Sequence, residues 1–110
     1  MHTQTSTLTL HRNEDELICV ISGDIDHHSA RTVRTQIDDA LISRRPSRLV
    51  LDLSQVSFMD SSGLGLILGR FSKSSELGSD FLLLNPNEAV TRILDIAGIG
   101  RLIKIERKKS

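Results

Sequence analysis

The chain has 110 residues, the size of one compact domain, so we expect a single domain over residues 1–110. Basic and acidic residues number 14 each, and a chain without net charge has no general attraction to nucleic acid or to an anionic membrane. Aromatic residues make up only 3%, with no Trp or Tyr, which argues against base-stacking nucleic-acid binders and predicts a core of Leu, Ile and Val.

Cysteine usage and hydropathy favour a cytoplasmic location. The single cysteine, Cys19, lies in the apolar run Leu17–Ile21, and we expect it to be a buried core residue rather than a nucleophile. No signal-peptide pattern is visible at the start of the sequence. The longest apolar stretches are far below the roughly 20 residues that span a bilayer, so we expect no membrane span.

The first two predicted elements are strands. Leucines alternate with polar residues over Thr5–His11, a period of two that predicts a half-buried strand. Leu17–Ser22 is apolar on both faces, which predicts a more central strand paired with the first as a hairpin. Gly23 is expected to end this strand.

A helix and a parallel strand are predicted next. Apolar residues recur every three or four positions over His27–Ser43, which predicts an amphipathic helix with Asp26 as its N-cap. Pro46 lies just past the expected end of that helix. Arg48–Leu53 then reads as a short strand, and a crossover through a helix implies that it runs parallel to Leu17–Ser22.

The second predicted helix follows a connecting loop. Ser54–Met59 is expected to be that loop, and the helix begins at Asp60 or Ser61 and reaches about Leu77, with Gly78 placed to stop it. Four residues are predicted to form the buried stripe of this helix: Leu64, Ile67, Leu68 and Phe71.

The remaining elements complete an alternating pattern. Phe81–Leu84 predicts a buried strand, Asn87–Ala97 a third helix, and Leu102–Ile105 a last strand at a sheet edge. Strands that alternate with helices indicate an α/β fold with a mixed central sheet.

The most informative segment runs from Phe58 to Arg70. A loop enters a helix there through Asp60-Ser61-Ser62-Gly63, and the first N–H groups of a helix have no intrahelical partners and lie at the positive end of its dipole. From position alone, capping is the favoured role of a serine hydroxyl at that place, although the helix N-terminus would also stabilise a phosphate added to it.

Glycines inside this predicted helix need an explanation. Gly63, Gly65 and Gly69 each destabilise a helix by up to about 1 kcal/mol relative to Ala. Gly65 and Gly69 lie one turn apart on one face, so a close backbone approach is expected there. The sequence leaves open whether the approaching group belongs to the sheet or to a partner.

Three segments carry a family resemblance. F-M-D-S-S-G-L-G-L-I-L-G-R, residues 58–70, closely resembles the phosphorylation-site motif of bacterial anti-sigma factor antagonists of the STAS type. Gly23–Ala30 and Ile93–Ile99 resemble two further segments characteristic of that family. The resemblance implies one STAS-type domain, with helices packed mainly on one side of a mixed sheet.

Within the family, the sequence is most similar to the sporulation branch, which antagonises the anti-sigma F factor. The pair His27-His28 and the run Ser62-Gly63 followed by Leu68-Gly69-Arg70 carry that similarity. A general-stress antagonist, or another stand-alone STAS regulatory module, remains the alternative.

The resemblance also implies a mechanism. Ser61 is the expected phosphorylation site, and the kinase is the anti-sigma factor itself, which binds ATP or ADP. The unphosphorylated chain binds that kinase and releases sigma, phosphorylation switches binding off, and a PP2C-type serine phosphatase restores it. We expect the chain to be a monomer. The residues expected to bind the partner are the following: Asp26, Asp60, Ser61, Ser62, Gly63 and Gly65. Asp24, His27 and His28 are weaker candidates for the same surface.

The sequence argues against an enzyme. The serine segment lacks the first glycine of the G-x-S-x-G elbow of hydrolases, and Gly63, Gly65 and Gly69 do not have the spacing of a dinucleotide-binding loop. The histidines are spaced unlike metal ligands, with His2 and His11 nine residues apart. We therefore expect no enzyme activity, no catalytic residue, no metal and no cofactor.

Overall fold

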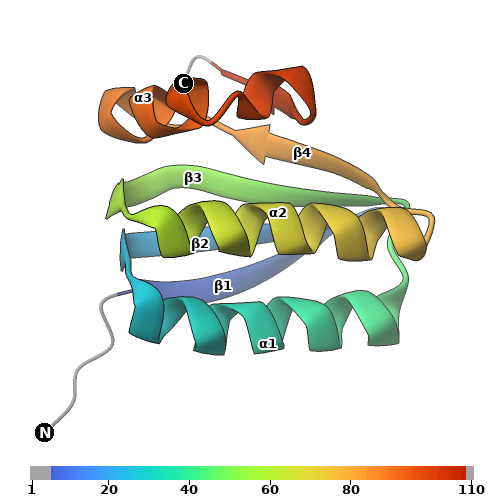
Figure 1. Ribbon diagram of the computed structural model, residues 1–110. Coiled ribbons are helices and arrows are strands. Elements are labelled where there is room, and N and C mark those ends of the chain that lie inside the picture. The colour runs from blue at the N-terminus through green and yellow to red at the C-terminus, as the bar shows by residue number, and fades with distance from the viewer. Residues whose placement is uncertain (1–5, 109–110) are drawn as a thin grey trace, which may run out of the picture.

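The computed structural model describes residues 6–108, in which five strands form one sheet with the order β1-β2-β3-β4-β5 (Figure 1). Strands β1 and β2 are antiparallel, and the other neighbouring pairs are parallel, so the sheet is mixed as predicted. The strands have these bounds: β1 Ser6–Asn13, β2 Glu16–Ile25, β3 Arg48–Met59, β4 Asp80–Leu84 and β5 Lys104–Glu106.

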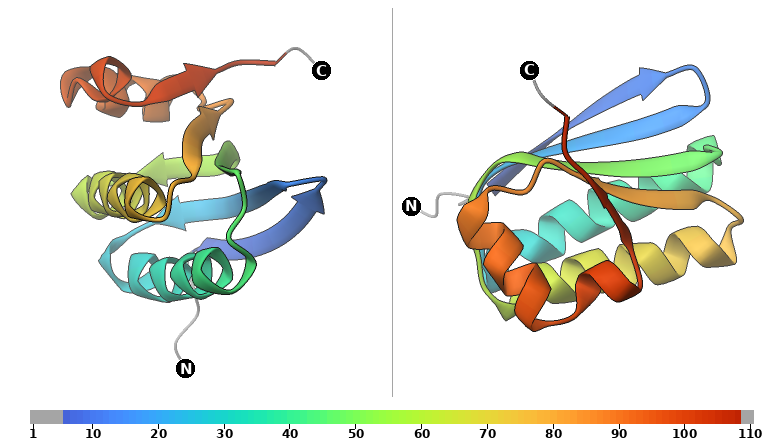
Figure 2. Two further views of the ribbon diagram at one scale, coloured as in Figure 1. Left: turned by 90° about the vertical axis from the view of Figure 1, so that its right-hand side faces the viewer. Right: turned by 90° about the horizontal axis from the view of Figure 1, so that it is seen from above.

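The helices cover one face of this sheet. Figure 2 shows α1 (His27–Arg44) and α2 (Ser61–Glu76) lying side by side against that face, with α3 (Glu88–Ile96) and the short 3-10 helix η1 (Ile99–Arg101) beside β4 and β5. The prediction of helices mainly on one side is confirmed. No helix formed by residues 6–108 lies on the opposite face of the sheet.

The core between helices and sheet is aliphatic, as the composition predicts. The side chains of Leu17, Ile21, Leu49 and Leu51 on the two central strands are almost completely buried under the helices. Among the described residues, the only aromatic pair is Phe71 with Phe81, whose ring centroids lie 5.7 Å apart at the margin of this core.

Two strand boundaries differ from the prediction. Gly23 does not end β2, and residues 54–59 are not a loop, because β2 and β3 remain paired as far as Ile25 and Met59. The register shifts near Ser22 and again after Gly23, so buried and exposed positions no longer alternate strictly along β3. These irregularities remove the period of two by which a strand is recognised in sequence.

Smaller differences concern the second helix and the last strand. Leu68 is 38% exposed whereas Leu66 is buried, so the buried stripe of α2 is rotated from its predicted position. β5 begins only at Lys104, because η1 occupies Ile99–Arg101 and leaves Leu102 exposed. Thr5, predicted as the first residue of β1, lies outside the described residues.

Candidate functional site

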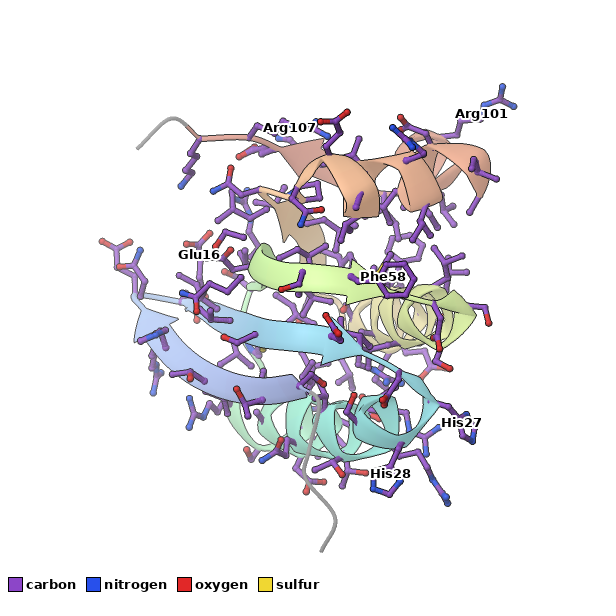
Figure 3. All side chains as sticks on the ribbon, turned by 90° about the vertical axis from the view of Figure 1, so that its left-hand side faces the viewer. Glu16, His27, His28, Phe58, Arg101 and Arg107 are labelled. Carbon is purple, nitrogen blue, oxygen red and sulfur yellow. The ribbon has the colours of Figure 1, made fainter. Side chains whose placement is uncertain are left out.

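Both long helices begin at the same edge of the sheet. Strands β2 and β3 end side by side at Ile25 and Met59, and each chain segment turns directly into a helix. A hydrogen bond from the Asp60 amide to the Ile25 carbonyl, 3.3 Å long, joins the two turns. We refer to residues 24–28 and 58–63 as the helix-start edge, which faces the viewer at the right of Figure 3, where His27 and Phe58 are labelled.

At the start of α2, the cap is Asp60. Its carboxylate Oδ1 accepts the Ser62 amide at 2.8 Å. Ser61 is exposed at the first helical position, and among residues 6–108 its hydroxyl has no hydrogen-bond partner. Because the aspartate caps the helix, the Ser61 hydroxyl is not occupied by capping.

At the start of α1, the predicted cap is confirmed and is more elaborate. The Asp26 carboxylate accepts the Ser29 amide at 2.9 Å, and the Ser29 hydroxyl accepts the Asp26 amide at 3.3 Å, which together form a capping box. Ser29 is completely buried, and Asp26 is half-buried. The Asp26 carboxylate is thus engaged by the fold before any partner arrives.

The glycines of α2 divide into two kinds. A Cβ atom at Gly63 would lie 2.7 Å from both Cβ and the sulfur of Met59, so the fold itself requires this glycine. A Cβ atom at Gly65 or Gly69 would meet nothing within 4 Å. The described residues therefore make no close approach at Gly65 and Gly69 of the kind that the sequence allows.

A hollow of about 270 Å³ lies between the first turns of α1 and α2. Its lining residues are His27, Ala30, Arg31, Arg34, Ser62, Gly65 and Leu66. Sequence reasoning missed Arg31 and Arg34, because two basic residues on the polar face of an amphipathic helix are normally solvated.

A largely buried ion pair lies farther along the same helix–helix contact and was also missed. Arg70 Nε lies 2.8 Å from Asp38 Oδ1, although the N–H is not aimed well enough for a hydrogen bond, so charge rather than directed bonding holds the pair. Burial lowers the pKa of Arg70, Asp38 opposes this, and nearby Arg34 lowers that pKa further. Removing Asp38 would leave Arg70 without its carboxylate partner and next to the like charge of Arg34.

Other reactive groups are not assembled into a site. Burial raises the pKa of Cys19 to about 12, with Arg44 opposing the shift, so the thiol stays protonated and covered as predicted. The Ser61 hydroxyl is hydrogen-bonded to neither His27 nor His28. Within the described part of the chain, no three His, Cys, Asp or Glu residues lie together as metal ligands would. His2 lies outside that part.

No helix within residues 6–108 is long and apolar enough to cross a membrane.

Comparison with known proteins identifies the family. The model of the STAS domain matches residues 7–110, and the chain belongs to the STAS domain family. Its relatives include the anti-sigma F factor antagonist of Paenibacillus polymyxa, 40% identical over 81% of this chain and 76% of the relative. The antagonist of the same name from Lysinibacillus sphaericus is 30% identical over 91% and 82%. The anti-sigma-B factor antagonist of Bacillus subtilis is 33% identical over 88% and 87%.

Solved structures agree with this assignment. The anti-sigma factor antagonist SpoIIAA in its unphosphorylated form superposes with a TM-score of 0.82 at 26% identity, covering 94% of this chain and 90% of that one. The Bacillus cell fate determinant SpoIIAA in the phosphorylated form gives a TM-score of 0.75 at 25% identity, covering 94% and 93%. Within the STAS family, the chain therefore falls in the group whose characterised members are anti-sigma factor antagonists.

Proposed function

We propose that this chain is an anti-sigma factor antagonist whose docking to its anti-sigma factor is switched off by a phosphate on Ser61. The observation that carries the proposal is the exposed Ser61 hydroxyl at the first position of α2, which capping leaves unused because Asp60 is the cap. The relative SpoIIAA, solved in unphosphorylated and phosphorylated forms, supports a switch of this kind.

In the proposed reaction, the partner is an anti-sigma factor that is also a serine kinase and holds ATP. The Ser61 oxygen forms a bond to the γ-phosphorus, the bond from that phosphorus to ADP breaks, and a base on the kinase takes the hydroxyl proton. An exposed serine on a rigid helix start suits this reaction, since the hydroxyl reaches the kinase without any local unfolding. A PP2C-type serine phosphatase reverses the modification by hydrolysis.

The proposed docking surface is the helix-start edge with the adjoining turn of α2. It includes Asp26, Asp60 and Ser62 beside Ser61, with Gly63 and Gly65 behind them. A phosphate adds a charge of about −1.5 to −2 to this contact. Repulsion from the bound nucleotide and from acidic groups of the partner then weakens binding, and a loss of about 4 kcal/mol corresponds to roughly a thousandfold in affinity.

For the particular sigma factor, we propose sigma F and a cytoplasmic setting, with the chain acting as a monomer. The 40% identity to an anti-sigma F factor antagonist favours that branch. The 33% identity to an anti-sigma-B factor antagonist keeps a general-stress role as the second candidate. Binding to the anti-sigma F kinase and to the anti-sigma-B kinase of one organism, measured side by side, separates the two.

The first experiment tests the site. The chain is incubated with an anti-sigma factor kinase and ATP, and the product is analysed by intact mass and peptide mapping. We expect one added phosphate, on Ser61. Phosphate found only on Ser62 or Ser57 would refute the assignment.

The second experiment tests the switch. Ser61→Asp should weaken binding to the kinase by at least tenfold while the denaturation midpoint stays within error. Ser61→Ala should bind like the unmodified chain and remain bound after incubation with ATP. A Ser61→Ala protein that binds no better than Ser61→Asp under these conditions would contradict the switch.

A further inference from the structure

The hollow between α1 and α2 gathers positive charge next to the start of α2. The cations Arg31 and Arg34 line it from α1 together with His27 and Ala30, and none of the described residues that line it is acidic. The α2 wall consists of Ser62, Gly65 and Leu66. Ser62 directly follows Ser61, and Gly65 lies one turn below Ser61 on the same helix face.

The two arginines of the hollow have no carboxylate partner among residues 6–108. Both are exposed, and the ion pairs in that part of the chain engage other basic residues. The nearest carboxylate along the helix–helix contact, Asp38, is already paired with Arg70. Burial is the main cause that lowers the pKa of Arg70, and repulsion from Arg34 lowers it further, so the two guanidiniums repel each other. An anion placed in the hollow would relieve an excess of positive charge.

The surroundings of Ser61 have the opposite sign. Asp60 already occupies the positive end of the α2 dipole, and Asp24 and Asp26 lie on the neighbouring turn of the helix-start edge. A phosphate on Ser61 would be repelled by these carboxylates, and the helix N-terminus alone has little positive charge left to offset the repulsion. Positive charge supplied by another element would offset this repulsion.

We propose that Arg31 and Arg34 are an intramolecular receptor for the phosphate on Ser61, which turns into the α1–α2 hollow and is held there by both guanidiniums. Arginine is suited to this because its planar fork donates two parallel hydrogen bonds to phosphate oxygens. Gly65 leaves the path open, since a Cβ at this position would meet no described atom within 4 Å apart from its chain neighbours and the backbone of its own helix. The inference rests on the proposed function and states how the modified site is stabilised.

The test uses chain that carries phosphoserine at position 61, installed during translation by stop-codon suppression. The second pKa of the phosphate, ordinarily about 6, is measured by phosphorus NMR at low salt. We expect this pKa to be lower than in the double variant Arg31→Gln/Arg34→Gln by about half a unit or more, a threefold or larger change in the proton dissociation constant. Arg44→Gln, at the far end of the same helix, is the matched control and should leave the pKa unchanged.

A second readout separates contact from a general effect of charge. The side-chain Nε–H signals of Arg31 and Arg34 should shift with the midpoint of the phosphate titration, whereas the Arg44 signal should not. Equal phosphate pKa values in the parent and the double variant would overturn the proposal, as would a shift of the same size in Arg44→Gln.

The competing occupant of the hollow is an acidic side chain of the anti-sigma factor. In that case the unphosphorylated double variant would bind the kinase at least tenfold more weakly while the phosphate pKa stayed unchanged, which also overturns the proposal. Because phosphoserine is installed without a kinase, failure of the kinase to modify Ser61 would end the proposed function but would leave the titration readable. Denaturation midpoints of the unphosphorylated variants verify that each is folded.

Discussion

The starts of α1 and α2 are built from the same residue types and differ in what they leave accessible. Each helix follows a strand through an aspartate cap, and each has serine within its first turn. In α1 the serine is Ser29, at the third helical position, where it completes a capping box and is buried. In α2 the third position is Gly63, pressed against Met59, and the serines stand earlier, with Ser61 exposed.

The difference shows that one side chain beneath a helix, that of Met59, determines whether the first turn can hold a buried capping serine. A serine at the third position of α2 would place its Cβ in contact with Met59, so the capping box of α1 cannot be repeated there. The cap of α2 then depends on Asp60 alone, and a hydroxyl remains free on the surface. Packing beneath the helix thus leaves the hydroxyl available for modification.

The largest expected effect comes from placing the same charge at both starts. Ser29→Asp buries a carboxylate beside the Asp26 carboxylate, whose Oδ1 lies 3.1 Å from the Ser29 hydroxyl, and should destabilise the fold by about 3 kcal/mol or more. Ser61→Asp, the matched variant at an exposed helix N-terminus, should change the free energy of unfolding by less than about 0.5 kcal/mol. Urea denaturation measures the free energy of unfolding of both variants, and similar losses of stability would contradict the difference between the two helix starts.

The next effect concerns the glycine that separates the two starts. Gly63→Ala should destabilise the chain by about 2 kcal/mol, because the added methyl overlaps Met59. The control is Gly65→Ala, which meets open space and should stabilise α2 by up to about 1 kcal/mol. If thermal denaturation shows the two variants equally stable, the explanation for the absent capping box is wrong.

A smaller effect compares the two caps. Asp26→Ala removes a carboxylate that accepts both the amide and the hydroxyl of Ser29, and should destabilise the chain by about 1.5 kcal/mol. Asp60→Ala removes one hydrogen bond to an exposed amide and should lower stability by about 0.5–1 kcal/mol. Denaturant midpoints at constant pH give the two losses of stability, and a larger loss for Asp60→Ala than for Asp26→Ala would contradict this prediction.

The smallest expected effect is a pH dependence of stability caused by the thiol of Cys19, which is buried, in contrast to the exposed hydroxyl of Ser61. Burial raises the thiol pKa from 9.0 to about 12, so the folded state favours the protonated thiol. That stability is fully present well below pH 9 and is lost as the pH rises toward 12, by about 1.4 kcal/mol at pH 10. Denaturation between pH 8 and pH 10 should show this extra slope relative to Cys19→Ala, and equal slopes would contradict it.

The helix starts were predictable from sequence because capping is local. Asp26 stands three residues from the amide that it accepts and was predicted as the cap of α1, whereas the start of α2 was predicted only as Asp60 or Ser61, since a serine there can also cap. Ser61 was predictable as a phosphorylation site only through the resemblance to a family, since position alone favoured a capping role for this serine.

The continuation of the central strands was not predictable. Residues 54–59 look like a loop because two register shifts against β2 remove the alternation, and their pairing partners are about 30 positions away in sequence. Asn87 likewise depends on a contact with a distant segment. Its side-chain amide donates to the carbonyls of Val56 and Ser57, so the start of α3 is hydrogen-bonded to the last part of β3. Contacts between distant segments determine these features, and no short window of sequence contains them.

The sequence by itself determined the order of elements, the aliphatic core and the Asp26 cap, because periodicity and capping act between residues a turn or less apart. Only the tertiary structure decided that Gly63 is fixed by Met59 while Gly65 faces open space, and that Arg31 and Arg34 meet Ser62 across one hollow. The physical reason is that these relations depend on how α1 and α2 pack against each other and against β3, and packing joins residues that are far apart along the chain.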